Sequence, residues 1–528
     1  MSEENGLPKG WAQTTLGEIC SRPQYGWTTK ANPKSGHVKL LRTTDISGDS
    51  INWDTVPYCT EIPENLDAYR LAEDDIVISR AGSVGVSHLL SYIPVETVFA
   101  SYLIRFRPNK EIDPRYVAYY LQTSKYWASI HEQSVGIALA NVNARKLEAI
   151  EFPLAPLPEQ QRIVAAIEQQ FSRLDAGVAA LRQAKEKLKR YRAAVLKAAV
   201  EGKLTETWRV EHPVTEPASK LLECILAERR AKWEADLRAK GKDSAKVRYV
   251  EPKGPDVESL PELPEGWRWA TVEQVTSRSE YGTSIKCDYT AKGIPVLRIP
   301  NIAAGEIDLS DMKYSVQPLA IDQDSALQSG DILVCRTNGS VSLIGKAALV
   351  RVPLEPYHTF ASYLLRFRLF EASILPRWLH LFVSSSQGRA FIESNAASSA
   401  GQHNISLTLM YSMRFPVPPL AEQEQIASEV EQRLSIVSEL EATVEANLKR
   451  AERLRQSILK EAFAGRLVPQ DPNDEPASVL LERIRGERNG RKNGKVDRKA
   501  IENIVLEEPV NLDVEGMQQA GLWEGVGG

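Results

Sequence analysis

Apolar residues recur at every seventh position along two long stretches of the chain. The first stretch holds Ile167, Leu174, Leu181, Leu188 and Val195, with Val164, Phe171 and Val178 as a companion series. The second holds Val430, Val437, Val444, Ala451 and Ile458, with Ala427 and Leu434 beside it. This spacing predicts two long helices, over about 156–204 and 418–467, paired as an antiparallel coiled coil. The alternative is that each helix packs on its own globular domain.

A different pattern precedes each long helix. Short β-like runs alternate with turn residues, as in "HVKLLRTTDISGDSINW", "DDIVISRAGSVGVSHLLSYI" and "TVFASYLIRFRP", and a helical stretch is expected over Pro114–Gln133. Strands and a few helices without βαβ alternation indicate the α+β class. We therefore predict two globular domains, 1–155 and 260–417, each ahead of a long helix.

The two halves of the chain are copies of one unit of about 260 residues. "LPKGW" at Leu7–Trp11 returns as "LPEGW" at Leu263–Trp267, and "FASYLIRFR" at Phe99–Arg107 returns as "FASYLLRFR" at Phe360–Arg368. The segments 205–259 and 468–528 also match, each with a short helix and a basic stretch. A duplicated domain and helix predict a pseudo-twofold molecule, which suits a target that comes in two halves.

Composition narrows the class of protein without naming its function. The chain has 528 residues, of which 43% are hydrophobic and 25% charged, and this balance is typical of globular proteins. The formal net charge of −4 argues mildly against a DNA-binding protein that acts alone. We expect a cytoplasmic protein, because no apolar run approaches the roughly 20 residues that span a bilayer and the five cysteines suggest neither a disulfide framework nor a zinc site.

We find no motif for catalysis in the sequence. The histidines show no metal-binding spacing, so neither a catalytic residue nor a metal ligand is predicted. The nearest approach to a phosphate-binding loop is "GSVSLIGKA" at Gly339–Ala347, which has five residues between its glycines and Ala347 where magnesium needs Ser or Thr. A nucleotide site there is not expected.

Four polar loop clusters recur in both copies and are the candidate binding site. Arg, Lys, Asn and Gln on loops beside a sheet are side chains that read base edges or hold phosphates. The alternative for any one of them is an exposed loop residue or a structural salt bridge. The candidates are Tyr25, Thr28, Lys30, Arg42, Thr43, Arg80, Ser83, Asn141 and Asn143 in the first copy, and Tyr281, Thr283, Lys286, Arg298, Asn301, Arg336, Asn338, Gln402, His403 and Asn404 in the second.

The order of these pieces resembles the specificity subunit of a type I restriction–modification system. The resemblance is carried by the "LPKGW"/"LPEGW" openings, the "YG" and "FASYL" blocks, and "PLPEQ"/"PLAEQ" leading into helices that end in "EGKL"/"AGRL". It implies two target recognition domains that each read one half of a bipartite double-stranded DNA site, and paired helices that set the gap. It also implies two methylation subunits using S-adenosylmethionine, and restriction subunits using ATP and magnesium, with no cofactor on this chain.

Two other classes stay open at this point. One is a coiled-coil scaffold that binds two protein partners and no DNA. The other is a self-sufficient DNA-modifying enzyme whose site the sequence does not reveal.

Overall fold

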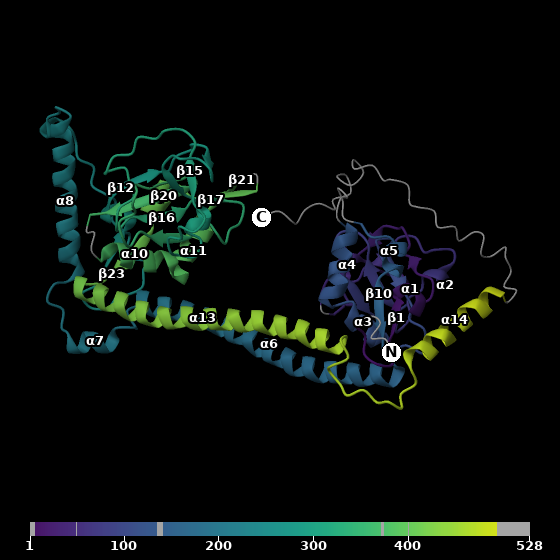
Figure 1. Cartoon of the computed structure of the whole chain (residues 1–528). Helices are drawn as coiled ribbons and strands as arrows, with labels where there is room; N and C mark the ends of the chain where they lie inside the picture. The colour runs from purple at the N-terminus through teal and green to yellow at the C-terminus, as the bar shows by residue number, and fades with distance from the viewer. Residues whose placement is uncertain (1–5, 49, 135–140, 371–373, 400, 494–528) are drawn as a thin grey trace. The chain divides into compact units, whose positions relative to one another are not determined.

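The computed structural model describes residues 6–48, 50–134, 141–370, 374–399 and 401–493, and these divide into two compact units (Figure 1). Unit 1 comprises Met1–Val178 and Lys449–Gly528, and unit 2 comprises Ala179–Leu448. The long helices are α6 (Leu157–Val200) and α13 (Leu420–Ala462), close to the predicted ranges. Each unit therefore holds one sheet-containing domain, the start of the helix that follows it, and the end of the other long helix.

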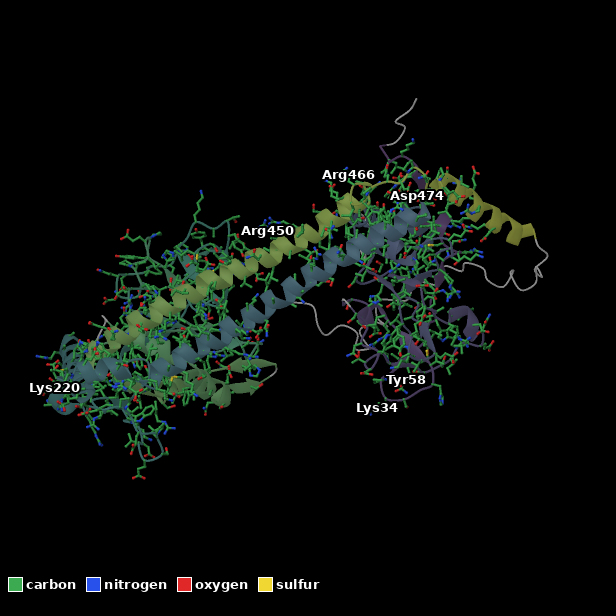
Figure 2. The ribbon with its side chains drawn as sticks, turned by 90° about the horizontal axis from the view of Figure 1, so that it is seen from below. Lys34, Tyr58, Lys220, Arg450, Arg466 and Asp474 are labelled. Carbon is green, nitrogen blue, oxygen red and sulfur yellow. The ribbon has the colours of Figure 1, made fainter. Side chains whose placement is uncertain are left out.

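The domain of unit 1 is built on two four-stranded sheets. One sheet has the order β2 (Gln24–Tyr25), β9 (Leu103–Phe106), β6 (Ile76–Ser79), β7 (Ser87–Leu89). The other has the order β3 (Ala31–Asn32), β5 (Tyr58–Cys59), β4 (Lys39–Leu41), β8 (Thr97–Phe99), with β4 and β8 parallel. A separate pair, β1 (Ala12–Thr15) with β10 (Glu151–Leu154), leads into α6. Figure 2 shows Lys34 and Tyr58 at the end of this domain that is remote from Asp474.

Unit 2 repeats this arrangement. Its sheets have the orders β12 (Thr276–Tyr281), β20 (Leu364–Leu369), β16 (Ile332–Cys335), β18 (Ala347–Leu349), and β13 (Cys287–Asp288), β15 (Lys313–Ser315), β14 (Pro295–Leu297), β19 (Thr359–Phe360). β11 (Arg268–Thr271) pairs with β23 (Arg414–Val417). A small third sheet joins β17 (Thr337–Asn338), β22 (Gln402–Asn404) and β21 (Ala397–Ser399). The α+β class predicted from the sequence is confirmed.

Short helices complete each domain. In unit 1 they are α1 (Leu16–Ile19), α2 (Leu66–Tyr69), α3 (Pro114–Tyr120), α4 (Ser124–Ser134) and α5 (Ala144–Glu148). In unit 2 they are α7 (Glu206–Glu211), α9 (Val272–Val275), α10 (Leu375–Ser384), α11 (Ser386–Asn395) and α12 (Leu407–Tyr411).

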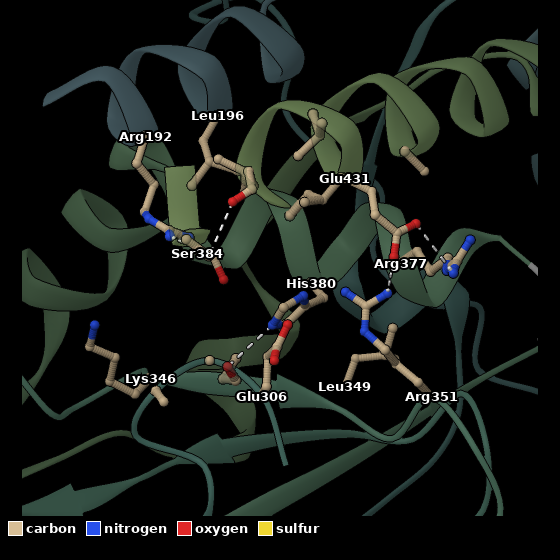
Figure 3. Close-up of a pocket in the computed structure, with 18 of the residues that line it drawn as sticks. Arg192, Leu196, Glu306, Lys346, Leu349, Arg351, Arg377, His380, Ser384 and Glu431 are labelled. Carbon is tan, nitrogen blue, oxygen red and sulfur yellow. Dashed lines mark hydrogen bonds and ion pairs between the residues drawn. The ribbon is translucent and has the colours of Figure 1, made fainter. Parts of the chain in front are cut away.

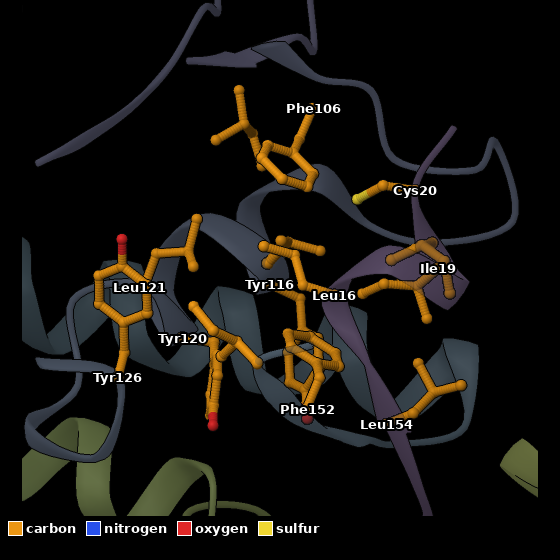
Figure 4. Close-up of a cluster of buried hydrophobic side chains, with 14 of the residues drawn as sticks. Leu16, Ile19, Cys20, Phe106, Tyr116, Tyr120, Leu121, Tyr126, Phe152 and Leu154 are labelled. Carbon is orange, nitrogen blue, oxygen red and sulfur yellow. The ribbon is translucent and has the colours of Figure 1, made fainter. Parts of the chain in front are cut away.

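The helical stretch predicted over Pro114–Gln133 is present but interrupted. The structure has two helices, α3 and α4, with a break at 121–123. Thr123 causes the break, because its hydroxyl oxygen accepts the backbone N–H of Tyr126 at 3.2 Å and so starts a new helix. Both helices still pack on the core: Tyr116, Tyr120 and Tyr126 lie fully buried in the cluster drawn in Figure 4.

The long helices contact each other and also enter the domain cores. In unit 2, Lys185 pairs with Glu445 at 2.9 Å and Arg192 with Glu441 at 2.9 Å, which fixes an antiparallel contact. In unit 1, the Arg455 guanidinium lies 4.1 Å from the centre of the Phe171 ring. The seam residues Val437, Val444, Ala451 and Ile458 are buried, while Leu174, Leu181 and Leu188 are half-buried. Ile163 and Ile167 at the start of α6 belong to the core of unit 1.

The "PLPEQ" and "PLAEQ" motifs join each domain to its helix. The Gln160 amide donates to the Ala155 carbonyl at 2.8 Å, and Gln423 donates to the Pro418 carbonyl at 2.8 Å. In unit 2 the buried carboxylate of Glu422 accepts the Trp267 indole N–H at 2.7 Å. These buried hydrogen bonds hold the first turn of the helix against the domain, which explains why the motif appears twice.

After each long helix, and beyond the short α7 in unit 2, a further helix docks on the domain of the same unit. In α8 (Ala218–Ala239) the side chain of Leu222 is buried, and in α14 (Ala477–Asn493) Leu480 and Leu481 are buried. The backbone contact is the same in both units: Ala477 N–H donates to the Gly10 carbonyl and Ala218 N–H to the Gly266 carbonyl, each at 2.8 Å. The basic end of the chain beyond residue 493 lies outside the described residues.

The sequence "RFR" recurs in both domains because its last arginine forms an ion pair with a buried aspartate. Arg107 forms two hydrogen bonds to the fully buried carboxylate of Asp75, at 2.6 and 2.8 Å. Arg368 binds the fully buried Asp331 in the same way, at 2.7 and 2.8 Å. The hydrogen bonds to Asp75 raise the pKa of Arg107. Because a buried charge must be paired, these residues form a structural core element of each domain.

Candidate nucleic-acid interface

Three of the predicted residues meet in unit 1. The Arg80 guanidinium lies 4.9 Å from the centre of the Tyr25 ring, and its Nε donates to Asn141 Oδ1 at 3.4 Å. The Tyr25 hydroxyl in turn accepts the backbone N–H of Ala144 at 3.0 Å. Tyr25, Arg80 and Asn141 are all half-buried, so each keeps an accessible face.

The matching residues meet in unit 2. The Arg336 guanidinium lies 4.5 Å from the centre of the Tyr281 ring, and its Nη2 donates to Asn404 Oδ1 at 3.2 Å. Thr337 also donates to Asn404 Oδ1, at 3.1 Å. Tyr281 is 45% exposed, and Asn404 is also exposed. We call these two sets of residues the Tyr–Arg–Asn clusters.

Backbone pairing positions each cluster rigidly. Arg80 and Arg336 directly follow the buried strands β6 and β16. The backbone carbonyl of Arg80 accepts the N–H of Val142 at 3.0 Å, and that of Arg336 accepts the N–H of Ile405 at 2.9 Å. The arginine and the asparagine therefore come from neighbouring chain segments, and the stacked tyrosine limits the rotamers of the guanidinium. Arginine preorganised in this way loses less entropy when it binds a base edge or a phosphate.

The "YG" and "FAS" blocks form one structural element behind each cluster. A Cβ at Gly26 would lie 2.2 Å from the Ala100 carbonyl oxygen, and one at Gly282 would lie 2.2 Å from that of Phe360. Only glycine permits this approach. The tyrosine before each glycine is thereby held beside the arginine.

Two predicted residues are held by internal partners. Arg42 makes a bidentate pair with Asp45, at 2.8 and 3.0 Å. Arg298 is bound to Asp311 at 2.8 Å, with its side chain 13% exposed. Both arginines therefore have local structural roles. This is the structural salt bridge given above as the alternative for any single loop residue.

Asn301 is 1% exposed, and its side chain is fully engaged. Its Oδ1 accepts the Arg298 backbone N–H at 2.8 Å, and its Nδ2 donates to the Asp308 carbonyl at 2.8 Å. We leave Asn301 out of the proposed interface, because it offers no free face to a ligand.

The other predicted residues differ in their exposure. Thr28, Lys30, Ser83, Lys286 and Gln402 are exposed, and Thr43, Thr283, Asn338 and His403 are half-buried. Asn143 is exposed and caps α5, with its Oδ1 accepting the Lys146 N–H at 3.0 Å. The recurring loop "GIALANVN" is described only from Asn141 onward, and its first residues, 136–140, lie outside the described residues.

Sequence reasoning missed one residue beside the first cluster. Tyr102 is 41% exposed, and its carbonyl oxygen accepts the Arg80 backbone N–H at 2.9 Å. Its place inside the repeated "FASYL" block was the available signal. Its counterpart Tyr363 accepts the Arg336 N–H at the same distance.

No group of three or more His, Cys, Asp or Glu residues that could hold a metal ion occurs among the described residues. Within the same ranges, no helix is both long and apolar enough to cross a membrane.

Comparison with known proteins addresses the family. Residues 8–190 match the family model described as "Type I restriction modification DNA specificity domain". The predicted resemblance to this family is confirmed. The specificity subunit of the type I restriction enzyme EcoKI from Escherichia coli K12 is 27% identical over 511 residues, which cover 93% of this chain and 98% of that protein. The StySPI specificity subunit from Salmonella potsdam is 25% identical, covering 91% of this chain and 96% of the relative.

A solved structure agrees at the level of the fold. It is described as "Structural basis underlying complex assembly and conformational transition of the type I R-M system", and its matched chain has a TM-score of 0.55 at 17% identity. The match covers 87% of this chain and 99% of that one. At this identity the likeness concerns the fold alone.

Proposed function

We propose that this chain is the DNA specificity subunit of a type I restriction–modification complex, reading a bipartite site with one domain per half. The main observation behind this proposal is that two equivalent Tyr–Arg–Asn clusters lie at equivalent positions of two equivalent domains. A duplicated reader suits two half-sites better than one continuous site. Arg80 and Arg336 are the residues assigned to DNA contact.

The long helices form the spacer in this proposal. Their antiparallel contacts, with the half-buried and buried seam residues, support a paired rod whose length is set by helical geometry. Two domains at 1–155 and 260–417, joined by helices within 156–204 and 418–467, make the molecule pseudo-twofold. The linker 205–259 and the tail 468–528 supply the docking helices α8 and α14.

The chemistry belongs to the partners. Methylation subunits bring S-adenosylmethionine, and restriction subunits bring ATP and magnesium, while this chain contributes recognition and no catalysis. Phosphate-facing charge comes partly from those partners, which accommodates a net charge of −4 on this chain.

Sequencing of methylated adenines in cells that carry this chain with its methylation partner tests the proposal. We expect a motif of two short specified halves with an unspecified gap. Replacement of residues 7–155 by the domain of a related protein should change one half and preserve the other. A scaffold that binds no DNA predicts no motif at all, and a change in both halves would contradict one reader per half. A purified chain that turns over DNA without partners would favour the self-sufficient enzyme.

A further inference from the structure

A cavity of about 780 Å³ lies beside the long helices of unit 2 (Figure 3), but much of its charged lining is held by internal partners. Glu431 on α13 is shared by Arg351 at 3.1 Å and Arg377 at 3.7 Å, and Figure 3 shows both guanidiniums directed at it. Arg389 is paired with Glu393 at 2.7 Å. These contacts tie α13 and α11 to the domain and are structural. A freer group of polar side chains lies at the surface of the same domain, on β21 and β22.

The strands β21 and β22 form a ribbon with almost no apolar side chain. β21 has the sequence Ala-Ser-Ser and β22 the sequence Gln-His-Asn, and Ser398, Gln402 and Asn404 are exposed. Figure 1 shows β21 at the edge of the domain, on the side away from α8. A ribbon without an apolar face gains nothing from burial in a core. The major groove of duplex DNA is about 12 Å wide and admits such a two-stranded ribbon.

One face of this ribbon continues the second Tyr–Arg–Asn cluster. Side chains alternate along β22, so Gln402 and Asn404 lie on one face and His403 on the other. Asn404 Oδ1 accepts Arg336 Nη2 at 3.2 Å, which places the guanidinium beside the face that carries Gln402. On the other face His403 is half-buried and lies in register with Asn338. A ligand that meets Arg336 therefore also meets Gln402.

The side-chain amide of Gln402 is free for a ligand. It has no hydrogen-bond partner among the described residues. A Cβ built at Gly339 would lie 3.6 Å from Gln402 Nε2, and because glycine has no side chain, nothing at this position binds or shields the amide. A carboxamide has an NH₂ group that donates and an oxygen that accepts. This pair matches the N7 acceptor and the N6 donor of adenine in the major groove.

We propose that Gln402 reads an adenine in the major groove of the half-site that unit 2 contacts. Asn404 acts beside it as a positioning residue, because Arg336 and Thr337 already donate to its Oδ1. The corresponding loop of unit 1 includes residues outside the described ranges, so the inference concerns unit 2 alone. It deepens the proposed function, on which it rests, by assigning one base and one groove to one side chain.

Methylated-motif sequencing in cells that carry the chain with its methylation partner tests this assignment. The half-site of unit 2 is the half that stays unchanged when residues 7–155 are exchanged. In Gln402→Ala we expect one adenine of that half to become degenerate, with every other position kept. Discrimination at that position should fall by about tenfold to a hundredfold, as for loss of one bidentate base contact.

Gln402→Glu gives a result that loss of structure cannot imitate. A carboxylate accepts from cytosine N4 but has no donor for adenine N7. We therefore expect cytosine to replace adenine at the same position of the motif. A reader that failed to fold would not gain a new specificity, so this variant decides the question even where Gln402→Ala is unstable.

Ser398→Ala is the matched control, because Ser398 is exposed on the opposite face of the ribbon, in register with His403. It should leave the motif unchanged. In a binding assay with the wild-type complex, a duplex whose adenine at this position lacks the N7 acceptor should bind about fivefold to tenfold more weakly, as for loss of one hydrogen bond. The same duplex should make no difference to Gln402→Ala, which has already lost that bond.

An unchanged motif in both Gln402 variants would overturn the assignment. Equal weakening of all sequences by Gln402→Ala would make Gln402 a contact to the DNA backbone instead. Relaxation at a position that is not adenine would show that the carboxamide reads another base. A wild-type complex that leaves no bipartite motif would overturn the proposed function itself, and this result differs from a bipartite motif that Gln402 does not affect.

Discussion

At the scale of single residues, the arginine of each Tyr–Arg–Asn cluster is the most direct test of DNA recognition. We expect Arg80→Ala to affect one half-site and Arg336→Ala the other. A lost base contact should cost about 1–3 kcal/mol and relax one position, whereas a lost phosphate contact should weaken all sequences and reduce the salt dependence. Binding to duplexes varied one base pair at a time, over a range of salt concentrations, separates these cases.

Arg42→Ala is the control for this experiment, because Arg42 is held by Asp45 within its own turn. Wild-type affinity of Arg80→Ala at every salt concentration would remove Arg80 from the interface.

The glycine of each "YG" block gives a second residue-scale prediction. Gly26→Ala should destabilise unit 1 by about 1–3 kcal/mol, the usual cost of overpacking, because the new Cβ meets the backbone of Ala100. Gly177→Ala is the same change within α6, where a Cβ meets nothing within 4 Å, and it should stabilise by up to about 1 kcal/mol. Denaturant unfolding of both variants measures the two changes in the free energy of unfolding, which should have opposite signs. Equal effects would mean that Gly26 is not sterically required.

At the scale of elements, the ion pair of Asp331, the residue before β16, with Arg368 in β20 should govern the stability of the second domain. Asp331→Ala removes the carboxylate that binds Arg368 at 2.7 and 2.8 Å, whereas Arg366 keeps Glu280 at 2.6 Å. Loss of one member of a buried pair costs about 3–5 kcal/mol. The side chain of Arg368 is 18% exposed and Asp331 is fully buried, so water replaces little of the lost interaction. Hydrogen exchange should show faster opening confined to unit 2, and Asp75→Ala should do the same in unit 1. An effect of Asp331→Ala spread evenly over both units would contradict this assignment.

Three buried or half-buried histidines predict how stability depends on pH. Burial lowers the pKa of His88, His358 and His380 below the ordinary value of 6.5. The unfolded chain therefore binds more protons than the folded chain below that pH, so stability is complete above it and falls as the pH drops further. The thermal unfolding midpoint should decrease as the pH is lowered from about 7.5 to 5.5. His380→Gln should make this decrease with pH less steep. An unchanged slope would mean that other groups control acid sensitivity.

Some helices and site residues could be predicted from the sequence and others could not, depending on the kind of signal that determines each. The seven-residue spacing predicted α6 and α13 closely, because the period of a helix is intrinsic to the backbone. The break between α3 and α4 was missed, because one Thr123 side chain decides it. The recurrence of Arg80 and Arg336 marked the clusters, but Arg42 and Asn301 looked equally suitable. Their internal partners became visible only once strand pairing had placed them.

At the scale of the whole molecule, the paired helices should measure the distance between half-sites. A heptad inserted only between Leu181 and Leu188 leaves seven residues of α6 without facing residues in α13, so stability should fall. Matched insertions, between Leu181 and Leu188 and between Val444 and Ala451, keep the seam of both helices in phase. Each matched heptad lengthens a rod by about 10 Å at 1.5 Å per residue.

The rotation of the DNA helix then sharpens the expected result. One matched heptad corresponds to about three base pairs, which turns the second half-site by about a third of a turn away from its reader. Three matched heptads add about 31 Å, close to one full turn of about 34–36 Å, so distance and face are both nearly restored. We expect weak binding at every gap with one heptad, and recovered binding with three heptads at a gap longer by about nine or ten base pairs. Methylated-motif sequencing reads the gap directly, and a stable, active three-heptad variant that keeps the original gap would show that another part of the complex sets the spacing.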